Sequence, residues 1–136
     1  LFSILKIDYM LDILSNRIIR ENDAVMFDID DTLIFTNGKA NKPIIDLVHY
    51  SKNLGYKVII MTARPDLVGI EAFTRYQLRM YDIPYDRLFL TPAENKGNLK
   101  RISGYNYILS VGDMDTDLTD TEYKIKISSE HRNLYT

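Results

Sequence analysis

The sequence predicts an α/β fold: a three-layer sandwich in which helices cover both faces of a parallel, five-stranded sheet. Five short apolar runs alternate along the chain with longer segments whose apolar residues recur every three or four positions. The short runs indicate buried strands, and the longer spacing indicates amphipathic helices. Strands that alternate with helices favour a parallel sheet. The 136 residues, 46% of them hydrophobic, suffice for one domain with its own core.

The charge and cysteine content exclude some classes of protein. The chain has a formal net charge of −2 and no cysteine. Disulfides and thiolate metal sites are therefore excluded, and a reducing compartment is favoured, so we expect a cytoplasmic protein. The near balance of charge makes nucleic acid less expected as a main partner without removing it. No apolar run reaches the roughly 18 residues of a membrane span, and we expect no membrane partner.

The chain is expected to divide into an N-terminal amphipathic helix at 1–22, a core at 23–128 and a polar tail at 129–136. Within the first segment, apolar residues recur at steps of three and four: Ile4, Ile7, Leu11, Leu14 and Ile18. Such a stripe is buried either on its own domain or in a dimer. We therefore expect a monomer or a homodimer.

Five apolar runs are predicted to be strands: 24–28, 57–61, 87–90, 106–111 and 123–127. The first run follows the turn-like segment Glu21–Asp23, and a turn at Asn37–Gly38 comes after it. The last run alternates apolar and polar residues more than the others do, which is typical of an edge strand.

Helices are predicted between the strands, at 43–54, 65–81 and 97–103, with a helical turn at 115–121. Pro43 and Pro65 suit the first turns of the first two helices, and Gly55 and Gly104 suit helix ends. The helix at 65–81 is expected to have one mainly apolar side, formed by Leu67, Ile70, Phe73, Tyr76, Gln77 and Met80.

Polar residues stand at or shortly after the ends of three of the predicted strands: Asp28, Asp30, Thr62, Asp113 and Asp117. Lys96 opens the helix before the fourth strand. Parallel sheets bind ligands outside the carboxyl ends of their strands. The sequence therefore predicts a ligand site at this edge of the sheet.

The aspartates of this edge favour a metal site. Like charges about 4 Å apart repel by several kcal/mol in a partly buried site, and a divalent cation relieves that repulsion. The ligands are all oxygen, which selects Mg²⁺ over zinc. Asp28 and Asp113, each at a strand end, are the main expected ligands. Asp115 and Asp120 are expected to be cap or turn residues instead.

An aspartate beside Mg²⁺ can attack phosphorus and form an aspartyl-phosphate. The transferred phosphoryl group needs donors and cations. The Thr62 hydroxyl, the backbone N–H groups of Ala63 and Arg64 at an expected helix start, and the Lys96 ammonium supply them. Taken alone, Thr62 fits an ordinary helix cap and Lys96 a solvated lysine, but the combination favours a site. The Arg64 side chain suits either a substrate contact or a surface position.

These residues occur in segments that resemble the four motifs of the haloacid dehalogenase superfamily. VMFDIDDTLIF resembles the first motif, DxDxT, at Asp28, Asp30 and Thr32. KVIIMTAR resembles the second motif at Thr62, and Lys96 matches the lysine of the third. SVGDMDTD resembles the fourth motif, GDxxxD, at Asp113 and Asp117. The resemblance runs from Ala24 to Ile127 and is greatest to the acid-phosphatase-like branch, subfamily III.

The resemblance implies a Rossmann-like core and a phosphatase activity. Asp28 would be the nucleophile, and Asp30 would protonate the leaving oxygen and then activate water. Mg²⁺ would be held by Asp28, Asp113 and the backbone carbonyl of Asp30. Asp117 would ligate through water or orient Lys96.

Four further expectations concern the loop after the first strand, the motif lysine and the cap. Thr32 would shape the loop after the first strand, and Asp31 would be exposed or a local hydrogen-bond acceptor. Lys96 is preferred over Lys100 as the motif lysine because it precedes its helix, whereas Lys100 is expected on the solvent face. The segments between the motifs are filled by core elements, so no cap domain is expected.

The expected function is therefore Mg²⁺-dependent hydrolysis of a phosphomonoester through an aspartyl-phosphate. A catalytically inactive phosphate-binding or regulatory domain is the alternative, against which the presence of Asp30 argues. A receiver-like signalling domain fits less well, because its acceptor aspartate follows a later strand. Without a cap, the phosphorylated substrate is expected to be bulky, such as a nucleic-acid end or a phosphoprotein, although nucleotides stay open.

Overall fold

The structure, a computed structural model, describes residues 2–128, with side chains from residue 6 onward. The predicted tail and the Ile4 side chain lie outside the described residues. Within residues 2–128, none of the helices is long and apolar enough to cross a membrane.

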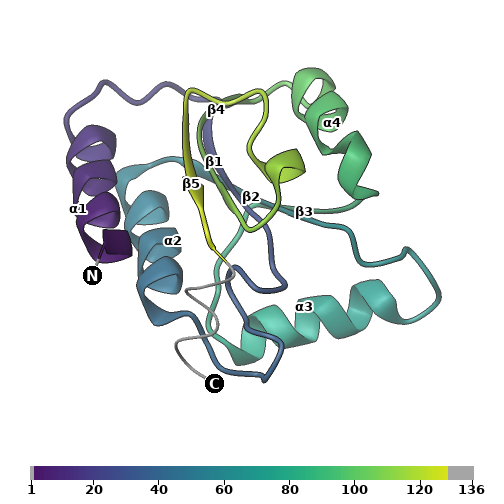
Figure 1. Ribbon diagram of the computed structural model, residues 1–136. Helices are drawn as coiled ribbons and strands as arrows, with labels where there is room; N and C mark the ends of the chain where they lie inside the picture. Colours follow the sequence, from purple (N-terminus) through teal and green to yellow (C-terminus); the bar gives the residue numbers. More distant parts are fainter. Residues whose placement is uncertain (1, 129–136) are drawn as a thin grey trace.

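A parallel sheet of five strands organises the domain (Figure 1). The strands are β1 (Asp23–Phe27), β2 (Lys57–Thr62), β3 (Arg87–Leu90), β4 (Asn106–Gly112) and β5 (Tyr123–Lys126). Their order across the sheet is β3-β2-β1-β4-β5. The predicted fold class is confirmed, and so is the placement of the last strand at an edge.

Four α-helices and two short 3₁₀ helices connect the strands: α1 (Phe2–Ser15), α2 (Lys42–Leu54), α3 (Ile70–Met80), η1 (Ala93–Asn95), α4 (Lys96–Ile102) and η2 (Asp115–Asp117). α1 and α2 lie side by side on one face of the sheet, and α4 covers the other (Figure 1). Pro43 stands in the first turn of α2, and Gly55 ends that helix in a left-handed conformation with φ of 111°, as predicted.

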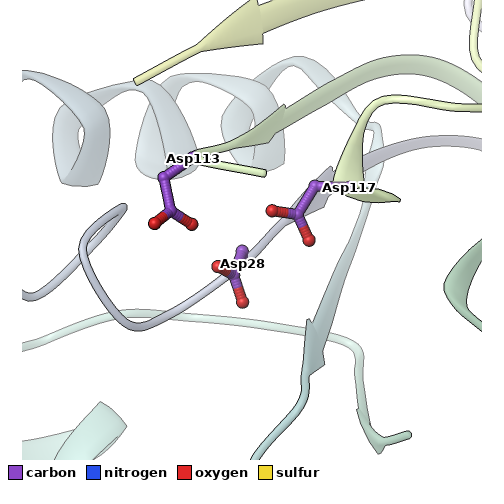
Figure 2. Close-up of side chains that lie close together, drawn as sticks. All are labelled: Asp28, Asp113 and Asp117. Atoms are coloured by element: carbon purple, nitrogen blue, oxygen red, sulfur yellow. The ribbon is translucent and has the colours of Figure 1, made fainter. Parts of the chain in front are cut away.

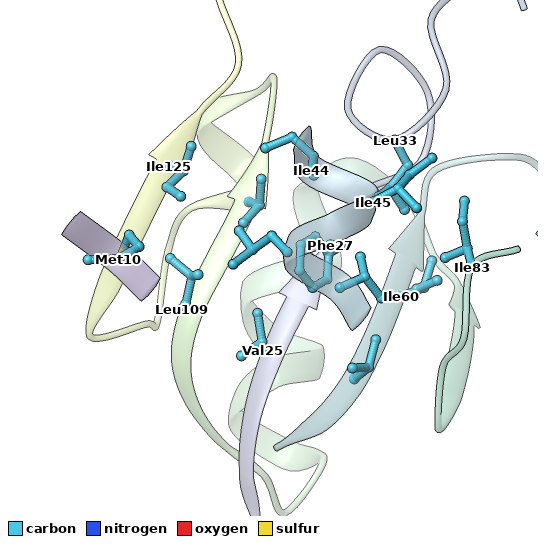
Figure 3. Close-up of a cluster of buried hydrophobic side chains, with 14 of the residues drawn as sticks. Met10, Val25, Phe27, Leu33, Ile44, Ile45, Ile60, Ile83, Leu109 and Ile125 are labelled. Atoms are coloured by element: carbon cyan, nitrogen blue, oxygen red, sulfur yellow. The ribbon is translucent and has the colours of Figure 1, made fainter. Parts of the chain in front are cut away.

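The central strand is buried on both faces, as expected for a parallel sheet between two helical layers. Val25 and Phe27 point to the α1 and α2 side, where they pack with Leu109 and Ile60 in the larger core cluster (Figure 3). Ala24, Met26, Ile59 and Met61 form a smaller cluster on the opposite face, against which Leu99 of α4 packs. The rigid centre of the sheet therefore holds the carboxyl ends of β1, β2 and β4 in place.

Two predicted helix boundaries are wrong. α1 ends at Ser15, and Ile18 is 88% exposed rather than part of a buried stripe. At this end the side-chain amide of Asn16 donates to the Asp12 carbonyl at 2.9 Å, competing with its own backbone N–H. α3 begins at Ile70, because Gly69 before it has a φ of 86°, which does not continue a helix.

The predicted apolar side of α3 faces solvent. Its exposed residues are Phe73 (55%), Tyr76 (53%) and Met80 (65%), and Leu67 (65%) of the preceding segment is exposed with them. The buried side of α3 is formed by Thr74 and Leu78 instead. Few side chains therefore attach α3 to the rest of the domain, and the helix lies beside the carboxyl ends of the strands (Figure 1).

Candidate active site at the carboxyl ends of the strands

Asp28 follows β1 at the centre of the sheet. Its backbone N–H donates to the Val111 carbonyl of β4 at 3.0 Å, which extends the strand pairing by one residue and fixes the residue's position. The side chain is largely buried, with 7% of the residue exposed. Asp28, Asp113 and Asp117 point toward one another (Figure 2), and their nearest carboxylate oxygens all lie within 4.8 Å.

Asp117 is fully buried in η2, the short helix after β4. Its Oδ2 accepts the backbone N–H of Met114 at 3.1 Å, which fixes the carboxylate against the preceding loop. A Cβ atom at Gly112 would lie 2.3 Å from the same Oδ2. Only glycine therefore fits at the end of β4 when Asp117 takes this position.

Lys96 lies between two of the carboxylates. Its ammonium is buried, 2.6 Å from Oδ1 of Asp117 and 3.1 Å from Oδ1 of Asp28. Burial acts to lower the pKa of Lys96, but the charges and hydrogen bonds of the two aspartates outweigh it and raise the pKa above its ordinary value. Lys96 is therefore charged and bound to the cluster.

One ammonium does not balance three carboxylates. Burial, the charge of Asp117 and a hydrogen bond with Asp113 raise the pKa of Asp28 to about 8, although Lys96 acts to lower it. The cluster thus takes up a positive charge, a proton when nothing else is bound. Its donors are all carboxylate oxygens, the set that a hard divalent cation prefers. These residues can bind a metal ion.

Asp30 is placed differently from the other three aspartates. Its side chain is 60% exposed and accepts two hydrogen bonds from Arg64, one from Nε at 3.0 Å and one from Nη2 at 2.9 Å. This paired geometry is the strong, forked form of an arginine–carboxylate contact. The carboxylate of Asp30 therefore lies at the open side of the site, beside the end of β2.

Arg64 connects this carboxylate to α3. Its side chain is only 14% exposed. Besides the pair with Asp30, Nη1 donates to the Thr74 hydroxyl at 3.1 Å and Nη2 to the Gln77 side chain at 2.8 Å. Arg64 is therefore not a free surface arginine, and its position depends on α3.

The environment of Thr62 corrects one expectation. Thr62 ends β2 and is 1% exposed, and its hydroxyl accepts the backbone N–H of Arg64 at 3.2 Å. The expected helix start directly after it is absent, because the next helix begins at Ile70. A phosphate here would meet the Thr62 hydroxyl without a helix N-terminus behind it.

The loop after β1 is held by its own hydrogen bonds. Asp31 accepts from the Thr36 hydroxyl at 2.7 Å and from the Thr36 backbone N–H at 3.0 Å, as a local acceptor was predicted to do. Thr32 is fully buried, and its carbonyl accepts the Asn41 side-chain amide at 2.8 Å. Its hydroxyl has no hydrogen-bond partner among the residues that the structure describes.

Sequence reasoning missed Lys100. The prediction that it faces solvent is wrong: it is 2% exposed and lies on the inner side of α4. Its spacing of four residues from Lys96 could have revealed this, because residues at i and i+4 share one face of a helix.

Comparisons with known proteins agree with this fold. Residues 25–86 match the model of the haloacid dehalogenase-like hydrolase family. A chain of a solved structure described as "Structure of Pnkp1/Rnl/Hen1 complex" superposes with a TM-score of 0.68 and 19% identity. The match covers 85% of this chain and 49% of that one, so this chain spans about half the length of its structural neighbour. No curated protein matches.

Proposed function

We propose that this chain, which has a haloacid dehalogenase-like hydrolase core, is a Mg²⁺-dependent phosphatase that hydrolyses a phosphomonoester through an aspartyl-phosphate on Asp28. The observation that carries the proposal is the group of three carboxylates, two buried and one half-buried, with Lys96 between Asp28 and Asp117. A carboxylate held beside a cation site and an ammonium is arranged for attack on a dianionic phosphate rather than for stability alone.

The residues that would hold Mg²⁺ are Asp28 and Asp113, with the backbone carbonyl of Asp30. Asp117 already accepts hydrogen bonds from Lys96 and Met114. Its role would therefore be to orient Lys96 and to contact the ion through a water molecule. When bound, the ion would neutralise carboxylate charge and the charge of the phosphoryl oxygens.

In the first step, an oxygen of Asp28 forms a bond to phosphorus while the bond from phosphorus to the ester oxygen breaks. Asp30 gives its proton to that leaving oxygen. In the second step, water attacks phosphorus, its proton passes to Asp30, and the bond from phosphorus to Asp28 breaks. Inorganic phosphate leaves, and both aspartates return to their starting forms.

The Thr62 hydroxyl and the Lys96 ammonium would bind the oxygens of the transferred group. Both are almost completely buried, so they are fixed before the substrate arrives and need little reorganisation during the reaction. Lys96 would also keep the Asp28 oxygen directed at phosphorus.

We place the chain in the capless, acid-phosphatase-like branch of the superfamily. Among the described residues, core strands and helices fill the segments between the four motifs. The site stays open at Asp30, and α3 next to it displays Phe73 and Tyr76. Such a site suits a phosphate carried on a large body, a nucleic-acid end or a phosphoprotein side chain.

A catalytically inactive, phosphate-binding domain is the second candidate. It is favoured by one observation: both oxygens of the Asp30 carboxylate are engaged by Arg64. An acid catalyst must be able to pass a proton to the leaving oxygen, and here both carboxylate oxygens of Asp30 are occupied as hydrogen-bond acceptors. Turnover therefore requires that Asp30 leave Arg64, or share it, as the substrate binds.

The deciding experiment measures phosphate release from an aryl phosphate with Mg²⁺ and with EDTA. The proposal predicts release with Mg²⁺ that EDTA abolishes. Binding of Mg²⁺ and inorganic phosphate by calorimetry without any release, over a wide range of pH and substrates, would favour the inactive domain. Equal release with Mg²⁺ and EDTA would contradict both.

A further inference from the structure

Lys100 is a buried cation that the proposed chemistry does not use. It lies in α4, one turn after Lys96, and is 2% exposed. An ammonium without partners is very costly to bury, so its contacts should show what it stabilises. Burial lowers the pKa of Lys100 to about 8.

Three acceptors surround the Lys100 ammonium. Nζ donates to the hydroxyl of Ser110 at 2.9 Å, the carbonyl of Asp117 at 2.6 Å and the carbonyl of Thr119 at 2.7 Å. The ring of Tyr107 lies 5.7 Å from Nζ on a further side. The three protons of an ammonium are thus matched by three oxygens.

These acceptors join two parts of the site. Ser110 belongs to β4, the strand that leads to Asp113. The two carbonyls belong to the segment 117–119, whose first residue provides a carboxylate of the candidate metal cluster. Lys100 therefore fixes the backbone of the segment that carries Asp117 against β4.

The close approach of α4 to this segment makes the contact possible. A Cβ atom at Gly97 would lie 2.7 Å from the Thr119 hydroxyl and 2.8 Å from a carboxylate oxygen of Asp120. α4 therefore holds the segment at two levels: Lys96 binds the carboxylate of Asp117, and Lys100 binds the carbonyl of the same residue.

We propose that Lys100 is a positioning residue that holds the 117–119 backbone so that the Asp117 carboxylate stays in the metal cluster and against Lys96. The proposal rests on the metal-dependent function proposed above. Removing the ammonium would take this donor from the buried Asp117 carbonyl and the partly buried Thr119 carbonyl, and the segment would relieve the loss by moving toward water. Loss of an indirect partner of a metal site typically lowers metal affinity or activity by about 10–100-fold.

Arg101 offers a matched control on the same helix. Its Nη1 donates to both carboxylate oxygens of Asp120, at 3.0 and 2.9 Å, and its side chain is 58% exposed. This contact also joins α4 to the segment after η2, but it reaches neither the Asp117 carbonyl nor β4. If any contact that attaches α4 to this segment were enough to position the site, losing the Arg101 contact would be as harmful as losing the Lys100 contacts.

The test compares Lys100→Met, Lys100→Gln and Arg101→Met in the full chain. Lys100→Gln keeps a side-chain N–H donor, so it provides a folded variant if Lys100→Met does not fold. Mg²⁺ affinity is measured by calorimetry, kcat/KM with an aryl phosphate, and hydrogen exchange at the Met114 amide by NMR. That amide donates to the Asp117 carboxylate, so its protection reports the position of Asp117 with or without metal.

We expect the folded Lys100 variants to bind Mg²⁺ at least about tenfold more weakly and to lose protection at the Met114 amide, while Arg101→Met stays within about twofold of wild type. Lys100 variants that only melt at lower temperature, with unchanged Mg²⁺ affinity and Met114 protection, would overturn the proposal. Equal losses in Arg101→Met would overturn it too. If wild type neither binds Mg²⁺ nor turns over substrate, the proposed function fails, and exchange at the Met114 amide still decides the role of Lys100.

Discussion

At the scale of single residues, the carboxyl group of Asp28 is buried beside two other carboxylates, those of Asp113 and Asp117. A carboxyl group with a folded-state pKa of about 8, raised from 3.8, binds a proton that the unfolded chain has already released at neutral pH. The folded state therefore holds more protons across this range, and the free energy of unfolding falls as pH rises. A divalent cation in the cluster would displace that proton and reverse the loss.

This argument predicts a pH dependence of stability in EDTA. Between about pH 5 and 7.5, Asp28 should lower the free energy of unfolding by up to about 1.4 kcal/mol per pH unit. Urea unfolding at several pH values measures the slope. Asp28→Asn, which cannot ionise, should lose this contribution, and about 10 mM Mg²⁺ should flatten it in wild type. Equal slopes in the two proteins without metal would refute the assignment.

Gly112 is a second residue that a nearby side chain constrains, because the Asp117 carboxylate leaves no room for a Cβ atom. Its backbone is not left-handed, so alanine would fail only because its Cβ would meet the Asp117 carboxylate. We predict that Gly112→Ala displaces Asp117 and removes most of the rise in melting temperature that Mg²⁺ produces by binding the folded state. Thermal melts with and without Mg²⁺ check this, and an unchanged rise would show that Asp117 is not part of the metal site.

At the scale of elements, α1 stabilises the domain but contributes no residue to the cluster. Leu14 is fully buried, Met10 is 4% exposed, and the Tyr56 hydroxyl donates to the Leu14 carbonyl at 2.7 Å. These contacts fix α1 against the core on the face opposite to α4. The helix thus lies on the other face of the sheet from α4, which carries Lys96.

We predict that Leu14→Ala lowers the free energy of unfolding by about 2–5 kcal/mol through lost burial and a cavity. Its kcat per folded molecule should stay near the wild-type value. Ile18→Ala is the control: its side chain is 88% exposed, and the change should be within about 0.5 kcal/mol. A stable Leu14→Ala protein with impaired catalysis would show that α1 shapes the site.

The strands could be predicted well from the sequence, and the helix boundaries less well. β1 and β2 are continuous apolar runs because both faces of the sheet are buried, and a short run of this kind between turn residues favours a buried strand. The start of α3 depends on the positive φ of Gly69, which the spacing of apolar residues does not reveal. Its exposed apolar side shows the limit of periodicity, which identifies a face but not what covers it.

The candidate site was predictable to a similar degree. The order of strands brings Asp28, Asp113 and Asp117 to one edge, so topology alone placed them together. The pairing of Asp30 with Arg64 could not be foreseen, because it depends on the direction in which a side chain leaves the loop before α3. The burial of Lys100 was indicated only by its spacing from Lys96, since residues at i and i+4 share one face of a helix. Whether each residue has its expected chemical role stays a prediction.

At the scale of the whole molecule, the open edge of the sheet should determine substrate size. Without a cap, a small metabolite would be surrounded on too few sides for tight, oriented binding. We predict a higher kcat/KM for a phosphorylated oligonucleotide or a phosphopeptide than for a sugar phosphate or nucleoside monophosphate. A strong preference for the small metabolite, by a protein that sedimentation shows to be monomeric, would contradict the open-site interpretation.

The central claim is that Asp28 attacks phosphorus, and turnover by Asp28→Asn tests it most directly. Asp31→Asn is the matched control: it changes a neighbouring carboxylate at a position with a φ of 61°, which asparagine also adopts. With Mg²⁺ and an aryl phosphate, we predict that Asp28→Asn keeps its fold and less than about a hundredth of the wild-type kcat, whereas Asp31→Asn keeps at least about half. An Asp28→Asn protein that turns over faster than that would contradict the claim.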